Sequence, residues 1–159
     1  MFAAGLATVL AFALVDNWPT ATPAGVLQRL MIAARTDLFL VLWTVLAIAD
    51  VARLRFVSPP DIVGSATDPG GRTLANALTF LQNTTEQVSI ALPAHFALAL
   101  VYERGALLVP VLGCMFSLGR LLFWIGNRRG AVGRALGFAL TFYPTVGALL
   151  LSIFLFVRR

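Results

Sequence analysis

The sequence contains little charge and few of the residues that soluble enzymes use for chemistry. Of its 159 residues only 12% are charged, 59% are hydrophobic, and the mean hydropathy is +0.88. A soluble domain of this size needs more polar surface to cover its core. The single cysteine excludes a disulfide framework within the chain, and the single histidine argues against a zinc or di-iron centre. We therefore expect no metal site.

Lysine is absent, so the positive part of the net charge of +5 comes from arginine alone. In a nucleic-acid-binding domain, Arg would form a stripe on a soluble surface, interleaved with aromatic residues. Here most Arg lie at the ends of apolar runs, where integral membrane proteins place them. The sequence predicts a multi-pass membrane protein that has the lipid bilayer as its surroundings and no nucleic-acid partner.

Five apolar segments predict an all-α bundle of membrane-spanning helices. The expected spans are residues 1–18, 37–55, 72–102, 106–126 and 135–157. The first has no basic start and no clean cleavage site, unlike a signal peptide, and Trp18 suits an interfacial anchor. Residues 26–36 are amphipathic and either lie along the membrane surface or extend the second span. We divide the chain into an N-terminal part, 1–36, and a four-helix transmembrane domain, 37–159.

The distribution of Arg predicts the orientation. The loops 56–71 and 127–134, with the helix ends beside them, carry most of the Arg and lie on one side. Cytoplasmic loops have an excess of basic residues. We therefore expect these loops and the N-terminus inside the cell and the C-terminus outside. Arg29 and Arg35 would then lie near the outer face, against the rule.

The stretch "LQNTTEQ", residues 81–87, places polar side chains at the start of an apolar run. At successive spacings of four, three, four and three, one helix face carries Arg72, Asn76, Thr79, Asn83 and Glu86, with Gln87 beside them. Polar groups inside a bilayer are costly unless they face a partner helix or a wet cavity. The stripe is therefore expected to point inward, either as hydrogen bonds between helices or, as we favour, as a ligand pocket.

Several Arg are expected at the same end of the bundle, namely Arg53, Arg55, Arg120 and Arg134. Arg120 lies within a span and needs a counter-ion, and Glu86 is the best candidate in the chain. A cationic pocket with one carboxylate suits an anionic ligand that also carries an amine.

These motifs resemble the MAPEG family, the membrane-associated proteins in eicosanoid and glutathione metabolism. "LQNTTEQ" resembles the motif of the second core helix. "GRLLFWIGNRRGAVGRALGFALTFYPTV", residues 119–146, is similar to the third and fourth core helices, and "VARLRFVSPP", residues 51–60, to the end of the first. The resemblance covers about residues 37–157, and the first span resembles an N-terminal addition of a bacterial type, which implies a bacterial inner membrane as the location. It implies a homotrimer that binds glutathione as co-substrate between subunits, near the cytoplasmic side.

The resemblance also implies roles for individual residues. Arg134 matches the Arg that contacts the thiol and is the catalytic candidate. The candidates for binding glutathione are Arg53, Asn83, Glu86, Gln87, Arg120 and Asn127. Thr79 stands where the family has a basic residue. Hydroxyl or His positions of the family are occupied here by Phe123, Asn127, Ala135 and Phe138.

Two functions from different classes follow. One is a glutathione-dependent transferase or peroxidase that acts on lipophilic electrophiles through an Arg-stabilised thiolate. The other is a non-catalytic trimeric membrane protein for binding or assembly, which the missing hydroxyls favour. Outside this site, we interpret His95 as a hydrogen-bonding residue between helices, Cys114 as a packing residue, and Gly133 with Gly137 as a close helix contact.

Overall fold

The structure, a computed structural model, describes residues 1–19, 25–57, 72–127 and 129–158. Its elements are α1 (Phe2–Asp16), α2 (Val26–Val57), α4 (Arg72–Val101), α5 (Gly105–Asn127) and α6 (Gly130–Val157). The predicted all-α bundle is confirmed. Residues 26–36 form the first turns of α2, so that helix is continuous across the expected boundary between parts of the chain.

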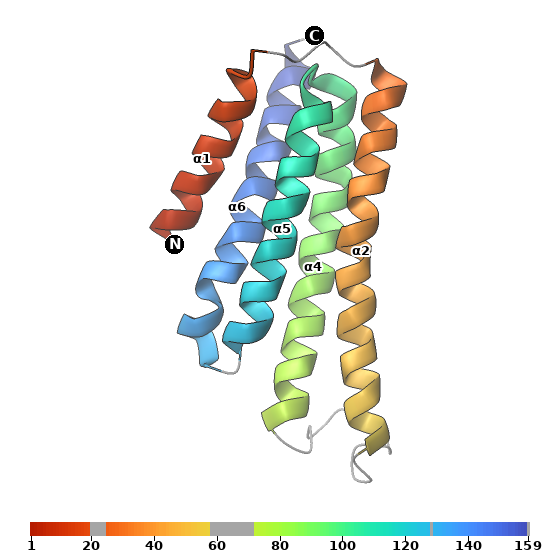
Figure 1. The fold of residues 1–159 in the computed structure, drawn as a ribbon, viewed down its shortest axis with the longest axis vertical. Coiled ribbons are helices and arrows are strands. Elements are labelled where there is room, and N and C mark those ends of the chain that lie inside the picture. The colour runs from red at the N-terminus through yellow and green to blue at the C-terminus, as the bar shows by residue number, and fades with distance from the viewer. Residues whose placement is uncertain (20–24, 58–71, 128, 159) are drawn as a thin grey trace.

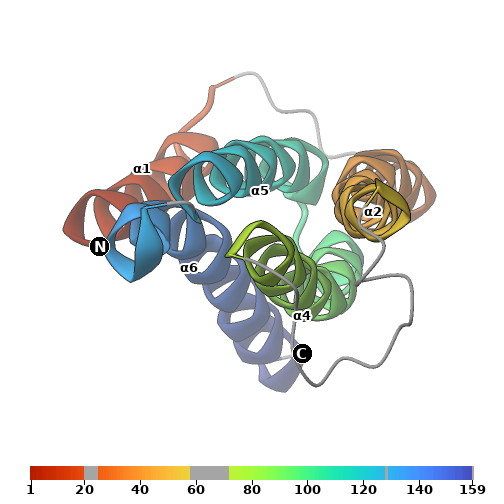
Figure 2. The same ribbon diagram turned by 90° about the horizontal axis from the view of Figure 1, so that it is seen from below.

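The helices α2, α4, α5 and α6 run alternately down and up and form a four-helix bundle (Figures 1 and 2). We call the end where α2 and α5 terminate the lower end, and the end where α4 and α6 terminate the upper end. The helix α1 lies outside this bundle and packs against α5 and α6. Its N-terminus points toward the lower end, and the C-terminus of the chain lies at the upper end.

Within the described residues, three helices, α2, α5 and α6, are long and apolar enough to cross a membrane. The helix α4 has 30 residues but carries the polar stripe. It packs against α2, α5 and α6, which shield part of its polar surface. The helix α1 has 15 residues and is about 22 Å long, less than the roughly 30 Å of hydrocarbon in a bilayer. Its length therefore does not support the full first span that the sequence predicts.

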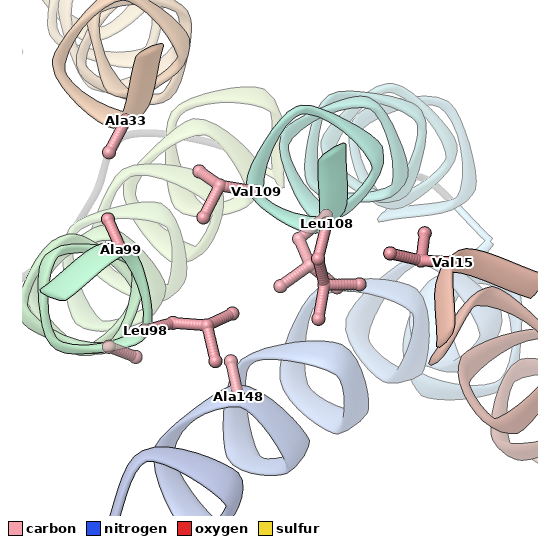
Figure 3. Close-up of a cluster of buried hydrophobic side chains, with 9 residues drawn as sticks. Val15, Ala33, Leu98, Ala99, Leu108, Val109 and Ala148 are labelled. Carbon is pink, nitrogen blue, oxygen red and sulfur yellow. The ribbon is translucent and has the colours of Figure 1, made fainter. Parts of the chain in front are cut away.

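All five helices contribute to the largest core cluster, in which four of the nine buried residues are alanine and the others are leucine or valine (Figure 3). Ala33, Ala99 and Ala148 are fully buried there, whereas large apolar side chains such as Phe39 on α2 face outward. Lipid is as apolar as these side chains, so helix association in a membrane depends on close packing of small residues rather than on hiding large ones. The arrangement is typical of a protein in lipid.

The contact between α5 and α6 depends on glycine. A Cβ atom at Gly137 would collide with the backbone nitrogen of Phe123, and one at Gly133 with the carbonyl oxygen of Gly126. The predicted packing role of Gly133 and Gly137 is confirmed. This close approach holds the first turns of α6 against the last turns of α5, where the candidate site lies.

Two Arg bind helix ends at the upper end of the molecule. Arg104 Nη1 donates hydrogen bonds to the carbonyl oxygens of Val15 (2.8 Å) and Trp18 (3.2 Å), where α1 ends. The buried Arg29 donates from Nε to the carbonyl oxygen of Ala99 (2.7 Å), where α4 ends. The last carbonyls of a helix have no partner within it, so these cations satisfy them and complement the helix dipole.

Tyr102 adds a second link to α1. Its hydroxyl donates to Asp16 Oδ1 at 2.9 Å. Partial burial, and after it the hydrogen bond that the hydroxyl donates to Asp16, raises the pKa of Tyr102 to about 12. We call the contacts of Tyr102 and Arg104 with α1 the upper latch, because they fasten α1 to the turn between α4 and α5.

Candidate functional site

Arg120 on α5 lies at the centre of the lower half of the bundle and is fully buried. Its Nη1 donates to Asn83 Oδ1 on α4 (2.8 Å), and its Nη2 donates to Thr141 Oγ1 on α6 (2.7 Å). The guanidinium also lies over the Phe123 ring, 4.9 Å from its centroid. One side chain thus joins three helices, and we call this group the Arg120 centre.

The expected ion pair between Glu86 and Arg120 is wrong. Glu86 is exposed and accepts a hydrogen bond from Gln82 Nε2 at 3.1 Å, one turn earlier on α4. Residues three positions apart on a helix differ by about 60° in direction, so Asn83 can point inward while Glu86 points outward. Within the described part of the chain, neutral oxygens and aromatic faces surround Arg120 in place of a carboxylate.

A pocket of about 420 Å³ opens beside the Arg120 centre. We call it the α4–α6 pocket. Its lining residues are Met1 of α1's N-terminal end, Thr79, Gln82, Asn83 and Glu86 of α4, Phe123 of α5, and Ala131, Arg134, Ala135 and Phe138 of α6. One wall is polar and carries the carboxylate, the opposite wall is apolar, and Arg134 supplies a cation between them. The pocket can therefore hold a small molecule with both charged and apolar groups.

Arg134 is half-buried in the first turns of α6 and is held by its neighbours. Its Nη1 donates to Asn127 Oδ1 at 3.1 Å. The buried Asn127 in turn donates from Nδ2 to the carbonyl oxygen of Asn76 at 2.7 Å. The Phe123 ring lies 5.8 Å from the guanidinium carbon of Arg134. Asn127 therefore positions Arg134 and connects it to α4, instead of facing the α4–α6 pocket itself.

Arg53 lies in a different cavity. A pocket of about 570 Å³, the α2–α4 pocket, is lined by Asp50, Arg53, Leu54, Thr73, Asn76, Ala77, Trp124, Asn127 and Gly130. Arg53 Nη2 pairs with Asp50 Oδ1 at 2.8 Å, and 65% of the Arg53 side chain is exposed. Within one chain, Asn83 and Glu86 thus line the α4–α6 pocket and Arg53 and Asn127 line the α2–α4 pocket, whereas Arg120 and Gln87 line neither.

The rest of the predicted polar stripe does not act as a unit. Thr79 lines the α4–α6 pocket, but its hydroxyl donates to the carbonyl oxygen of Ala75 at 2.9 Å. Gln87 is buried and lines neither pocket, and among the described residues its Oε1 has no hydrogen-bond partner. The side chain of Arg72 lies outside the described part of the structure.

A second buried polar pair lies away from this site. His95 Nδ1 on α4 is 2.6 Å from Asp37 Oδ1 on α2, and both side chains are almost wholly buried. The predicted role of His95 between helices is confirmed. Sequence reasoning missed its partner, although a signal was present: Asp37 is the carboxylate that opens the apolar run of α2. Sequence reasoning also missed Thr141 as a partner of Arg120. Its spacing of four from Gly137 is the one signal that the sequence offers for it.

Comparison with known proteins gives one match. The family model described as "MAPEG family" matches residues 30–154, which include most of α2, all of α4 and α5 and most of α6 but leave out α1. Neither the search of curated proteins nor the search of solved structures returned a match.

Proposed function

Because the chain belongs to the MAPEG family of membrane proteins, we propose that it is a glutathione-dependent transferase or peroxidase that acts on lipophilic electrophiles. The observation that carries the proposal is the α4–α6 pocket, in which Arg134, Glu86 and Asn83 face one cavity. The peptide glutathione carries two carboxylates, one ammonium group and one thiol. A pocket with a cation, a carboxylate and side-chain amides offers partners for one negative group, for the ammonium group and for the peptide groups.

The residues present fit glutathione in a specific way. Glu86 is the carboxylate in the pocket and is suited to the ammonium group, and Arg134 is the cation there. The amides of Asn83 and Gln82 can hydrogen-bond to the peptide groups. Arg120 does not line the pocket; it orients Asn83 by holding its Oδ1, so the Asn83 NH₂ group is directed away from Arg120.

Arg134 is the candidate that stabilises the thiolate. A thiol with a pKa near 8.5 loses its proton more readily beside a cation and at the N-terminus of a helix. Arg134 lies in the first turns of α6, which begins at Gly130, and so combines both effects. In the transferase reaction the thiolate sulfur forms a bond to an electrophilic carbon, and the bond to the leaving group breaks with its electron pair. In the peroxidase reaction two glutathione molecules reduce a hydroperoxide to an alcohol and water and become the disulfide.

The apolar wall suits the second substrate. Phe123, Ala135 and Phe138 face the same cavity, and a lipophilic molecule can enter from the bilayer beside them. These residues take no part in the chemical step: they bind the lipophilic substrate and exclude water from the pocket.

A homotrimer would complete the site. Arg53 lines the α2–α4 pocket and not the α4–α6 pocket of its own chain. Most of its side chain is exposed. A neighbouring copy could present its Arg53 to the α4–α6 pocket and so supply a cation for a carboxylate of glutathione, while Arg134 faces the thiol. Native mass spectrometry in mild detergents tests this point, and a monomeric mass across several detergents would contradict it.

The central test is glutathione binding to the purified protein by calorimetry, followed by ultraviolet absorbance of the bound thiolate. Arg134→Leu should retain most of the binding and lose the thiolate signal, and the rate should fall roughly 10²-fold, as when one charge-stabilising donor is removed from an active site. An unchanged thiolate signal would remove Arg134 from the mechanism.

A non-catalytic role is the second candidate, and one observation favours it. Three of the four positions that carry a hydroxyl group or His in the resembled family are Phe123, Ala135 and Phe138 here, and all three line the pocket. Binding of glutathione with no thiolate signal in the wild type would support a protein that binds without catalysis. The absence of any binding would contradict both forms of the proposal.

A further inference from the structure

A groove on the opposite half of the molecule is formed by α2 and α5. We call it the α2–α5 groove. It encloses about 410 Å³ and is lined by Ile32, Arg35, Thr36, Phe39, Pro110, Gly113, Cys114 and Ser117. Five of these eight residues are apolar, and the three polar ones are an Arg and two hydroxyl residues. The volume lies in the range of pockets for small molecules, roughly 300–1,000 Å³.

The floor of the groove is a close helix contact. A Cβ atom at Gly113 would collide with Thr36 Cγ2, so glycine permits α5 to approach α2 there. On either side of this contact, Phe39 and Cys114 are exposed. The groove therefore has an apolar base that is open to the surroundings of the protein, which here are lipid.

Arg35 is the charged residue of this groove. It is exposed, and among the described residues it forms no ion pair or hydrogen bond. The nearest carboxylate along the helix, Asp37, is directed to the other side of α2, where it pairs with His95. Arg35 lies nine residues after the start of α2, about 14 Å along its axis at 1.5 Å per residue, and the uncharged run 38–49 follows. A cation at the edge of an apolar run either extends toward the polar interface of the membrane or pairs with an anion.

From this combination we infer that the α2–α5 groove binds a single-chain anionic amphiphile, namely a fatty acid whose carboxylate pairs with Arg35. The planar guanidinium can bind a carboxylate through two parallel hydrogen bonds. The hydroxyls of Thr36 and Ser117 lie in the same groove, and the acyl chain would run along Phe39 and Cys114. This site does not depend on glutathione, because none of its residues lines the α4–α6 pocket.

The chain provides its own reporter. Cys114 is the single cysteine of the sequence and lies in the groove, so labelling by N-ethylmaleimide reports on this place alone. The full chain in nanodiscs of phosphatidylcholine would be labelled in the presence of increasing oleate, with mass spectrometry as the readout. Oleate should slow the labelling of Cys114. Methyl oleate, which has the same chain and no charge, should not.

Variants connect the protection to Arg35. Arg35→Gln should raise the oleate concentration for half-protection about tenfold, the factor that corresponds to losing a charge-assisted hydrogen bond. Arg35→Lys should retain most of the protection, and Arg55→Gln, with the same change of charge near the other end of α2, should behave as wild type. A cysteine at Leu118, an exposed position on α5, in a Cys114→Ser background controls for effects of oleate on the bilayer.

Several results would overturn the inference. Equal protection by methyl oleate, equal protection in Arg35→Gln, or equal slowing at the Leu118→Cys control would each show that the carboxylate does not bind at Arg35. Protection by phosphatidylglycerol but not by oleate would assign the groove to a phospholipid instead, against the occupant that we infer.

Discussion

Arg120 is the largest fully buried side chain among the described residues, yet neutral groups surround it. Two of its nitrogens donate to Asn83 and Thr141, and its guanidinium carbon lies over the Phe123 ring. Hydrogen bonds and aromatic faces stabilise a cation less than a carboxylate does, but they also leave no second charge to desolvate. The residue therefore joins three helices without an ion pair.

This arrangement predicts an asymmetry between two neighbours on α4. Asn83→Leu leaves Arg120 Nη1 without its partner and should lower the free energy of unfolding by about 1.5–3 kcal/mol. Glu86→Gln changes an exposed side chain and should stay within about 0.5 kcal/mol of wild type. Thermal unfolding in detergent measures both. Equal destabilisation by the two changes would instead support the Glu86–Arg120 ion pair that the sequence suggested.

The Asp37–His95 pair leads to a second prediction. Asp37→Leu and His95→Leu should each cost on the order of 3–5 kcal/mol, because each leaves one buried polar group without its partner. The double variant should cost less than the sum of the two. Thr44→Val is the matched control on α2: among the described residues the buried Thr44 Oγ1 has no hydrogen-bond partner, so its removal should cost little. Additive effects at 37 and 95 would show that the pair does not stabilise the bundle.

At the scale of the element, the upper latch determines how α1 is held. Tyr102 has a pKa of about 12, above its ordinary value of 10.0, so the folded state favours the neutral hydroxyl that donates to Asp16. The stabilisation from this bond is complete below pH 10 and is lost as the pH rises through 12. Loss of the Tyr102 proton also places the phenolate beside the negative carboxylate of Asp16.

We therefore expect α1 to loosen between pH 10 and 12. Spin labels at Leu6 on α1 and Leu150 on α6, both exposed, would report this in a Cys114→Ser background. The distribution of distances should broaden over that pH range. Tyr102→Phe has no hydroxyl to titrate, so its distribution should be nearly independent of pH. A wild-type distribution that does not change up to pH 12 would contradict the role of the latch.

The elements show what the sequence could and could not predict. Apolar runs and Pro- or Gly-rich breaks predicted α4, α5 and α6 closely, because segment length and hydropathy determine a helix in lipid. The partner of a buried side chain depends on helix rotation and on the register between helices. For that reason Arg120 was matched to Glu86 in the expectation, whereas the structure pairs it with Asn83 and Thr141. The exposure of Cys114 depends on packing in the same way and was also mispredicted.

At the scale of the whole molecule, the proposed trimer predicts complementation between chains. One chain carries Arg53→Leu and the other Arg134→Leu, so neither homotrimer has a complete site. If a site takes Arg134 from one subunit and Arg53 from its neighbour, an equal mixture should recover roughly a quarter of the glutathione-dependent activity. Recovery should vanish if both residues serve the same chain's pocket. Wild-type activity of either variant alone would show that the substituted residue is not part of the site.

The orientation is a further property of the whole molecule. From the Arg distribution we expect the lower end inside the cell and the upper end outside. Val132→Cys lies at the exposed start of α6 at the lower end, and Glu103→Cys lies in the exposed turn at the upper end. In a Cys114→Ser background, a membrane-impermeant thiol reagent applied to intact cells should label position 103 and not position 132. The reverse pattern would invert the topology.

The docking of α1 has a consequence for the order in which the protein is made. The ribosome completes α1 first, but its packing partners α5 and α6 are the last helices to be synthesised, and Arg104 of the latch is 86 residues after Trp18. At roughly 5–20 residues per second, about 5–20 s pass before that partner appears. During this time α1 must remain at the membrane without its final neighbours. Its sequence carries no charged side chain before Asp16, which suits a segment that has to wait in lipid until the rest of the chain arrives.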